Sequence, residues 1–475
     1  MASGAVKSQD LVAFYQQRIA SLNPLLHAVI ELNPQALAIA QQRDTERRNG
    51  RVRGPLHGVP ILIKDNIATG DSMQTTAGSL ALIGSRVPRD AVIVSRLRAA
   101  GAIILGKANL SEWANFRGAG PINGWSARGG FTRNAYRLDF DPGGSSSGSA
   151  VATAADMCAA AVGTETAGSI VHPAANNLVV GLKPTVGLIS QEGIIPVARS
   201  QDTAGPIART VTDAAILLGV MQSPFGPVMG YNIASSYTSF LKRGALRGAR
   251  VGVDRRYFTS RYGAGPHLAQ AAEAALSVIR GLGAIVIDTD SGDPLAYSDA
   301  HDTVLRVEFK SQIASYLTTL GNTSLRTLAD LISFNNAHCS SEMGYFGQEI
   351  FHSSHATHGD LNNQHYLAAR ALCVRLSRAQ GIDAALHRDN LDALVAPGFS
   401  LAFRPAAIAG YPNISIPIGL TSQGKPAALW MCSGFLQEGK LVGFAFDLEQ
   451  ELQPRNGIPL LQGAVPADPV SRVCS

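Results

Sequence analysis

The sequence predicts an α/β fold in which a central, twisted, mixed β-sheet is covered by helices on both faces. Short apolar runs typical of buried strands alternate along the chain with longer segments whose apolar residues recur at helical spacing. Hydrophobic residues make up 46% of the chain and charged residues only 16%, which favours a large core over disorder. The 48 glycines and 24 prolines provide for many tight turns between these elements.

The first elements along the chain are predicted to be helical. Residues 8–19 and 33–48 both show helical spacing, and the second segment is rich in Ala, Gln, Arg and Glu. The apolar run at residues 59–63 then predicts a strand, and the polar residues that follow place Lys64 at its buried end.

A strand-helix-strand unit follows. Asp90 is the expected N-cap of a helix over residues 91–100, Gly101 ends this helix, and residues 102–105 resume as a strand. Later apolar runs predict further strands at residues 251–254, 284–288, 391–396 and 414–418. The 475 residues could hold two or three domains, but no stretch resembles a linker, a charge block or a repeat, so we expect one domain over residues 1–475.

Charge and cysteine usage limit the class of protein. The net charge is only +5 and no Lys/Arg cluster is interleaved with aromatic residues, which argues against nucleic-acid binding. The cysteines are odd in number and widely spaced, which predicts a reducing compartment. Residues 1–7 lack a secretion signal, and no run of about 18 apolar residues occurs. We therefore expect a cytoplasmic protein without a transmembrane segment.

Residues 143–149, which read GGSSSGS, form the most unusual local pattern. Such runs are often flexible turns, but Pro142 precedes this one and small apolar residues at 151–155 follow it, which indicates an ordered turn at a helix start. A phosphate-binding loop is disfavoured because neither Gly-Lys-Ser/Thr nor GxGxxG is present.

Two readings place a nucleophilic serine in this region. Residues 144–148 fit the nucleophile elbow GxSxG with Ser146 at its centre, but residues 137–142 upstream are too polar for the strand that an elbow requires. The second reading is a serine hydrolase that works without histidine. Its catalytic residues would be Lys64, Ser145 and Ser169, the last of which lies in GTETAGSI at residues 163–170.

The segment from residue 141 to residue 185, with GGSSSGS, GTETAGSI and VGLKPT, resembles the amidase signature family. Residues 54–66 and 106–113 resemble it too, and residues 406–413 are similar to its returning strand. Within the family, residues 111–117 and 124–130 resemble peptide amidases and related plant amidases. The resemblance implies a signature core at about residues 54–218, a variable substrate-side region at about 219–390, and returning strands with C-terminal helices at about 391–460.

This resemblance implies that Ser169 is the nucleophile, that Ser145 is a bridging serine after a cis peptide bond, and that Lys64 is the base. An amine can act as a base near neutral pH only when it is uncharged, and burial at a strand end lowers a lysine pKa in that direction. We expect Ser146 to support Lys64 by a hydrogen bond, and Asp202 to tie the site loop to the sheet.

The oxyanion hole is expected to consist of backbone N–H groups from Thr166, Ala167, Gly168 and Ser169. The family usually has Gly or Asp where this chain has Ala167. If that position required a positive φ, alanine would be strained by about 1 kcal/mol and the activity would be low.

Several other residues have weaker assignments. Trp113, Phe116 and Trp125 are candidates for lining the substrate entrance, although they could equally belong to the core. The connection at residues 397–405, which usually walls the acyl pocket, is shorter than expected for peptide amidases. The spacing of His352, His355 and His358 could serve a metal, but the polar residues around them favour a loop, and we expect no metal or cofactor.

Together these features predict an amidohydrolase that cleaves linear amides through an acyl-serine, acting on a peptide C-terminal amide or a small aryl or acyl amide. The alternatives are a fatty-acid amide or N-acylethanolamine hydrolase, a tRNA-dependent amidotransferase subunit, and a non-catalytic member of the family. We expect a monomer or homodimer, and we expect its binding partner to be a small-molecule or peptide amide substrate.

Overall fold

The computed structural model describes residues 5–223, 230–231, 233–469 and 473–474. Its strands are β1 (Val29–Leu32), β2 (Pro60–Lys64), β3 (Ile103–Ala108), β4 (Trp125–Ser126), β5 (Gly130–Phe131), β6 (Ala160–Glu165), β7 (Val180–Lys183), β8 (Thr203–Ala208), β9 (Arg250–Val253), β10 (Ile285–Asp288), β11 (Ala393–Pro397), β12 (Asn413–Leu420) and β13 (Pro426–Cys432).

The α-helices are α1 (Ser8–Leu26), α2 (Ala36–Arg48), α3 (Val92–Ala99), α4 (Ser147–Ala154), α5 (Val171–Asn176), α6 (Val211–Met221), α7 (Pro266–Gly281), α8 (Ser298–Leu317), α9 (Leu328–Ala337), α10 (Cys339–Glu342), α11 (Glu349–His355), α12 (Gln364–Ser377), α13 (Asp383–Arg388), α14 (Phe403–Ala409) and α15 (Glu438–Leu452). The predicted helices at residues 8–19 and 33–48 correspond to α1 and α2.

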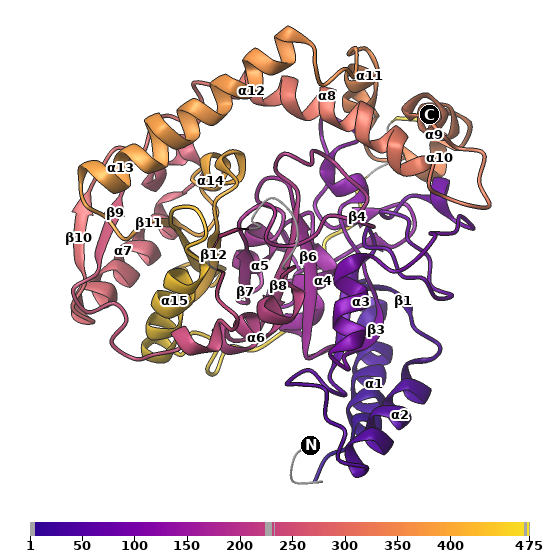
Figure 1. The fold of residues 1–475 in the computed structure, drawn as a ribbon, viewed down its shortest axis with the longest axis horizontal. Coiled ribbons are helices and arrows are strands. Elements are labelled where there is room, and N and C mark those ends of the chain that lie inside the picture. The colour runs from indigo at the N-terminus through magenta and orange to yellow at the C-terminus, as the bar shows by residue number, and fades with distance from the viewer. Residues whose placement is uncertain (1–4, 224–229, 232, 470–472, 475) are drawn as a thin grey trace.

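A mixed sheet of eleven strands runs through the described residues in the order β1-β3-β2-β6-β8-β7-β12-β13-β11-β9-β10 (Figure 1). The strand β2 pairs in parallel with β3 and β6, whereas β6 pairs antiparallel with β8. Strands β4 and β5 form a separate two-stranded sheet. The predicted fold class is confirmed.

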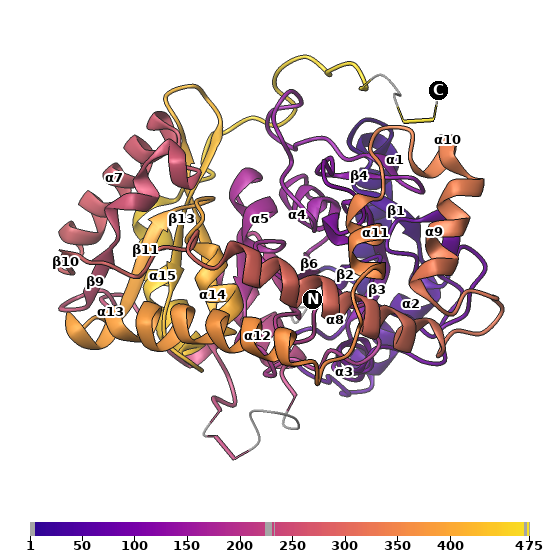
Figure 2. The same ribbon diagram turned by 90° about the horizontal axis from the view of Figure 1, so that it is seen from above.

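Helices cover both faces of this sheet and enclose two large cores. The helices α3, α6, α7 and α15 contribute to one core, and α1, α2, α4 and α5 contribute to the other. The helices α8 and α12 pack together along one long side of the molecule (Figures 1 and 2).

The alternation of side chains along β2 explains where Lys64 points. Ile61 and Ile63 belong to the first core, whereas Leu62 belongs to the second. Because successive residues of a strand face opposite sides, Lys64 faces the same side as Leu62, where α4 packs. The prediction of a buried lysine at this strand end is correct, and the Lys64 side chain has no exposed surface.

Three local predictions are wrong. The N-cap of α3 is Ala91, and Asp90 instead accepts a hydrogen bond from Gly70 N at 2.7 Å and pairs with Arg98 at 3.0 Å. The first part of the expected returning strand at residues 406–413 belongs to helix α14, and Gly410, with a φ of 70°, ends this helix before β12 begins.

The third wrong prediction concerns the histidines. His352 and His355 lie in helix α11 rather than in a polar loop. Within the described residues, no group of three or more His, Cys, Asp or Glu side chains is placed to hold a metal ion.

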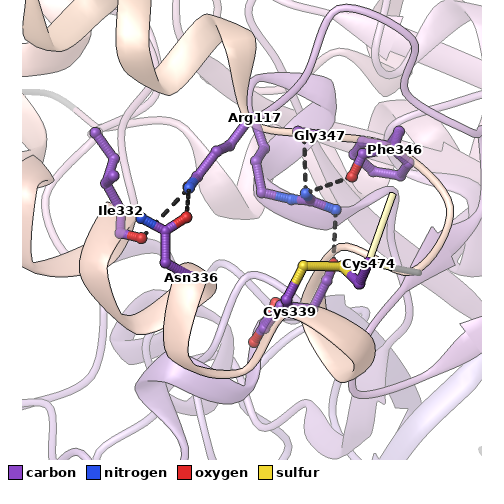
Figure 3. The surroundings of a disulfide bond; sticks show 9 residues. Arg117, Ile332, Asn336, Cys339, Phe346, Gly347 and Cys474 are labelled. Atoms are coloured by element: carbon purple, nitrogen blue, oxygen red, sulfur yellow. Dashed lines mark hydrogen bonds between the residues drawn. A yellow bond between two sulfur atoms is a disulfide. The ribbon is translucent and has the colours of Figure 1, made fainter. Parts of the chain in front are cut away.

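The cysteines also depart from expectation, since Cys339 and Cys474 form a disulfide with Cα atoms 5.8 Å apart. This bond ties the C-terminal segment to the start of α10, near the buried guanidinium of Arg117 (Figure 3). The two cysteines are 135 positions apart in the sequence, and a disulfide requires their Cα atoms to lie within about 7 Å of each other. Sequence spacing cannot show that the fold brings them together. The inference of a reducing compartment therefore loses its basis in the cysteines, and the cytoplasmic location stays a prediction.

The part of the chain that the structure describes contains no helix that is both long and apolar enough to cross a membrane. The predicted absence of a secretion signal concerns residues 1–7, of which residues 1–4 lie outside the described residues.

Candidate active site

A cavity of about 580 Å³ opens at the ends of β6 and α5. Its lining joins the loop after β6, helix α5, the glycine-rich run, the segment after β3 and residues from distant parts of the chain, namely Val197, Gly263, Leu268, Leu305 and Phe399. The lining residues from the other segments include Asn115, Phe116, Asn123, Phe140, Asp141, Gly144, Thr166, Ala167, Gly168, Ser169 and His172. The candidate nucleophile Ser169 is thus accessible from this cavity, whereas Ser145 is fully buried.

The buried amine of Lys64 lies among hydroxyl groups. Its Nζ atom is 2.7 Å from Ser145 Oγ, 3.0 Å from Ser146 Oγ and 3.0 Å from Thr164 Oγ1. No carboxylate is among these hydrogen-bond partners, so burial is not offset by a direct ion pair.

Burial lowers the pKa of Lys64 to about 7, against the smaller opposing effects of the carboxylates of Glu165 and Asp202. A substantial fraction of the amine is therefore uncharged at neutral pH. An uncharged amine has two hydrogens to donate and one lone pair with which to accept a proton.

The partners of Ser146 exclude its hydroxyl as the one that gives a proton to this lone pair. Ser146 Oγ donates to the main-chain oxygen of Thr164 at 3.0 Å and accepts from Thr164 N at 3.2 Å. Because a hydroxyl has one hydrogen, Ser146 can only accept from Lys64. The Thr164 carbonyl oxygen, 3.2 Å from Nζ, can also only accept. When the amine donates to these two acceptors, its lone pair is left for the hydroxyls of Ser145, at 2.7 Å, and Thr164, at 3.0 Å, of which Ser145 is the nearer.

Main-chain hydrogen bonds hold the two serine segments together. Ser146 N donates to the carbonyl oxygen of Ser169 at 3.1 Å, and the peptide bond between Gly144 and Ser145 is cis, as the resemblance implied. Gly143 has a φ of 72°, and a Cβ atom there would lie 2.7 Å from the Cα atom of Pro173. Only glycine permits this close approach to α5.

Residues 166–169 form a loop between β6 and α5 with main-chain N–H groups that are available to a ligand. Within the described parts of the chain, none of these four N–H groups donates to another residue. Gly168 has a φ of 87°, but Ala167 is not among the non-glycine residues with positive φ. The strain that a positive φ would impose on Ala167 is therefore absent.

Two carboxylates anchor this loop. Glu165 Oε2 accepts hydrogen bonds from the N–H groups of Ile170 at 2.7 Å and Val171 at 3.1 Å. Thr166 Oγ1 donates to Asp202, whose other oxygen accepts from Val197 N and Ala198 N. Asp202 thus connects the loop to the segment before β8, and burial raises its pKa.

The three aromatic candidates have different locations. Phe116 lines the cavity. Trp113 is 2% exposed and packs edge-on against Phe351. Trp125 is 3% exposed and contacts Tyr345 and Phe346. The two tryptophans therefore belong to packed clusters and do not line the cavity.

The sequence interpretation did not single out several residues of this site. Thr164 and Glu165 both lie within the GTETAGSI motif, so their position was a usable signal. His172 stacks on Phe399 with ring centres 3.4 Å apart, and burial lowers the pKa of His172 to about 4. Phe399 comes from the connection at residues 397–405, and no local pattern marks either ring as part of a site.

Comparisons with known proteins cover nearly the whole chain. A family model described as Amidase matches residues 10–442. A putative amidase of Schizosaccharomyces pombe is 40% identical over 498 residues, covering 95% of this chain and 84% of the relative. A probable amidase of Arabidopsis thaliana is 40% identical over 471 residues, covering 93% of this chain and 86% of the relative. The solved structure of native peptide amidase from Stenotrophomonas maltophilia matches with a TM-score of 0.90 and 47% identity, covering 97% of this chain and 96% of that one.

Proposed function

Because the chain belongs to the amidase family, we propose that it hydrolyses a carboxamide C–N bond through an acyl intermediate on Ser169. The resemblance predicted from the motifs is confirmed, as is the enzyme class of carbon-nitrogen hydrolase. The single observation that carries the proposed mechanism is the 2.7 Å contact between Lys64 Nζ and Ser145 Oγ, because Ser145 directly follows Gly144, which lines the same cavity as Ser169.

In the first step, Ser169 Oγ attacks the amide carbon while its proton passes to Ser145, whose own proton passes to the uncharged amine of Lys64. The carbonyl π electrons move to oxygen, and the main-chain N–H groups of residues 166–169 stabilise the resulting negative charge. Each such donor contributes about 3 kcal/mol to lowering the barrier.

In the second step, the C–N bond breaks and the leaving nitrogen takes a proton from Ser145, which is replenished from Lys64. Water then attacks the acyl-Ser169 ester and gives its proton to Ser145, which passes its own proton to Lys64. The carboxylic acid leaves, and Ser169 regains its proton. The net reaction consumes one water and releases one amine or ammonia.

A peptide C-terminal amide, or a small aryl or acyl amide, is the proposed substrate. The cavity volume of about 580 Å³ suits a ligand of that size. Asn115 Oδ1 is buried at the cavity and has no hydrogen-bond donor among the described residues, so it is available to a substrate N–H group. The likeness to the peptide amidase of Stenotrophomonas maltophilia supports the peptide amide.

A fluorophosphonate probe followed by peptide mapping tests the nucleophile. We expect labelling of Ser169 in the wild type and no labelling in Ser169→Ala. Labelling of Ser146 would instead support the elbow, and absence of labelling would support a non-catalytic family member. A panel of amides, with released ammonia or amine as the readout, then tests the substrate class.

A further inference from the structure

The lining of the cavity beside Ser169 has an uncompensated negative charge. Asp141 and His172 are the titratable groups among its described lining residues. Burial lowers the pKa of His172 to about 4, so its ring is uncharged at neutral pH. Asp141 is an exposed carboxylate and therefore gives the cavity its charge.

Neutral hydrogen-bond donors hold the Asp141 carboxylate in place. Its Oδ1 atom accepts from Gly143 N at 2.6 Å, and its Oδ2 atom accepts from Asn123 Nδ2 at 3.0 Å. Neither donor neutralises the charge. A carboxylate offers about four acceptor positions, so further positions remain for a cationic donor from a ligand.

The surrounding surface also suits a cation. The ring of Phe140 lines the same cavity, and an aromatic face attracts an ammonium or guanidinium group. Lys425 Nζ lies 5.4 Å from the centre of the Phe140 ring, but Lys425 is not one of the cavity-lining residues.

We propose that Asp141 is a specificity-determining residue that selects amides with an ammonium or guanidinium group in the acyl portion. This inference rests on the proposed function, because it concerns the substrate of the same cavity. A cationic group gains an ion pair with a fixed acceptor, whereas an anionic group of the same length is repelled. Each effect changes binding a few-fold at an exposed site, so together they separate the two substrates by about tenfold.

The test compares three N-acetyl amino-acid amides of matched length, derived from lysine, norleucine and α-aminoadipate. Ammonia release gives kcat/KM for each substrate. We expect the wild type to favour the lysine amide over the aminoadipate amide about tenfold, with the norleucine amide between them. Asp141→Asn keeps an oxygen that accepts from Gly143 N. In this variant, kcat/KM for the lysine amide should exceed that for the aminoadipate amide by no more than about threefold.

Asp139→Asn is the matched control. Asp139 is two residues away and exposed, but its carboxylate pairs with Arg137 at 2.7 Å and does not line the cavity. This variant should keep the wild-type ratio. Circular dichroism establishes that both variants are folded.

If Asp141→Asn does not fold, the inference is tested by the salt dependence of the wild-type preference for the lysine amide. Raising NaCl from about 0.02 M to about 0.5 M should reduce the lysine preference, because screening weakens interactions between exposed charges. A wild type without charge preference, a ratio unchanged in Asp141→Asn, or a ratio insensitive to salt would overturn the inference. Hydrolysis of the norleucine amide in those cases leaves the proposed function standing, whereas no hydrolysis of any amide together with an unlabelled Ser169 would overturn both.

Discussion

Glu165 Oε2 accepts a hydrogen bond from Ile170 N at 2.7 Å, which fixes the loop of residues 166–169 between the end of β6 and the start of α5. The same carboxylate acts electrostatically on Lys64 and raises its pKa against the larger effect of burial. One side chain therefore influences both the proposed oxyanion hole and the proposed base.

This double effect predicts the pH profile. Lys64 acts as a base only when uncharged, so wild-type kcat/KM should rise with pH through about 7. In Glu165→Gln the raising effect on the pKa is removed, while an amide oxygen can still accept from Ile170 N. The midpoint of the rise should move to lower pH. Glu192→Gln, an exposed carboxylate paired with Arg89, is the control, and an unmoved midpoint in Glu165→Gln would contradict the assignment of Lys64.

Replacing the base should separate activity from stability. The pKa of Lys64 is about 7 in the folded protein and 10.5 without burial, so the unfolded chain binds more protons between these values. Lys64 therefore destabilises the fold below about pH 10, and its effect on the stability becomes more favourable as pH rises from 7 to 10.5. Lys64→Met should lose nearly all turnover at pH 7, while its free energy of unfolding increases by about 1–2 kcal/mol.

Calorimetry at several pH values together with ammonia release checks this prediction. Lys107→Met is the matched control, because Lys107 is also fully buried but donates to Ile67 O and Thr75 Oγ1, away from the serines. This control should keep turnover. Wild-type turnover in Lys64→Met would eliminate the proposed relay.

The buried ion pair of Arg117 is expected to be essential for stability. Arg117 Nε lies 2.7 Å from Glu112 Oε1 with neither side chain exposed, and Arg117 Nη2 donates to the carbonyl oxygen of Glu342. Its Nη1 atom donates to the carbonyl oxygens of Phe346 and Gly347 (Figure 3). Arg117→Met would leave the Glu112 carboxyl buried without its partner and should cost about 3–5 kcal/mol of stability.

Thermal unfolding measures this cost. The pKa of Glu112 is already raised, mainly by burial and also by the neighbouring Glu342, so adding Glu112→Gln to Arg117→Met should recover part of the loss. Equal melting temperatures for wild type and Arg117→Met would show that the pair contributes little.

The disulfide should be detectable and stabilising. It closes a loop of 135 residues, and cross-links of this kind contribute about 2–4 kcal/mol through the entropy of the unfolded chain. Reduction should therefore lower the melting temperature of the wild type and leave the double variant Cys339→Ser, Cys474→Ser unaffected. Alkylation of both residues in denatured protein that was never reduced would show that the bond does not form.

The sequence alone determined the fold class and the identity of the candidate catalytic residues. Apolar runs and turn signals are local, so the buried end of β2 at Lys64 could be predicted from them. The three motifs that contain Lys64, Ser145 and Ser169 are specific enough to indicate the family. Boundaries that depend on capping, such as the start of α3 after Asp90, were less predictable because the Asp90 carboxylate binds Gly70 N, which is distant in sequence, in place of the helix N-terminus.

Only the tertiary structure decided how these parts meet. Parallel pairing of β2 with β6 brings Lys64 to Thr164, and packing of α4 on the same face adds Ser145 and Ser146. The location of the Asp141 carboxylate at the cavity and the packing of Trp113 in a core likewise depend on contacts between distant segments. Local patterns constrain φ, ψ and burial, whereas which distant side chains touch depends on the packing of the whole chain.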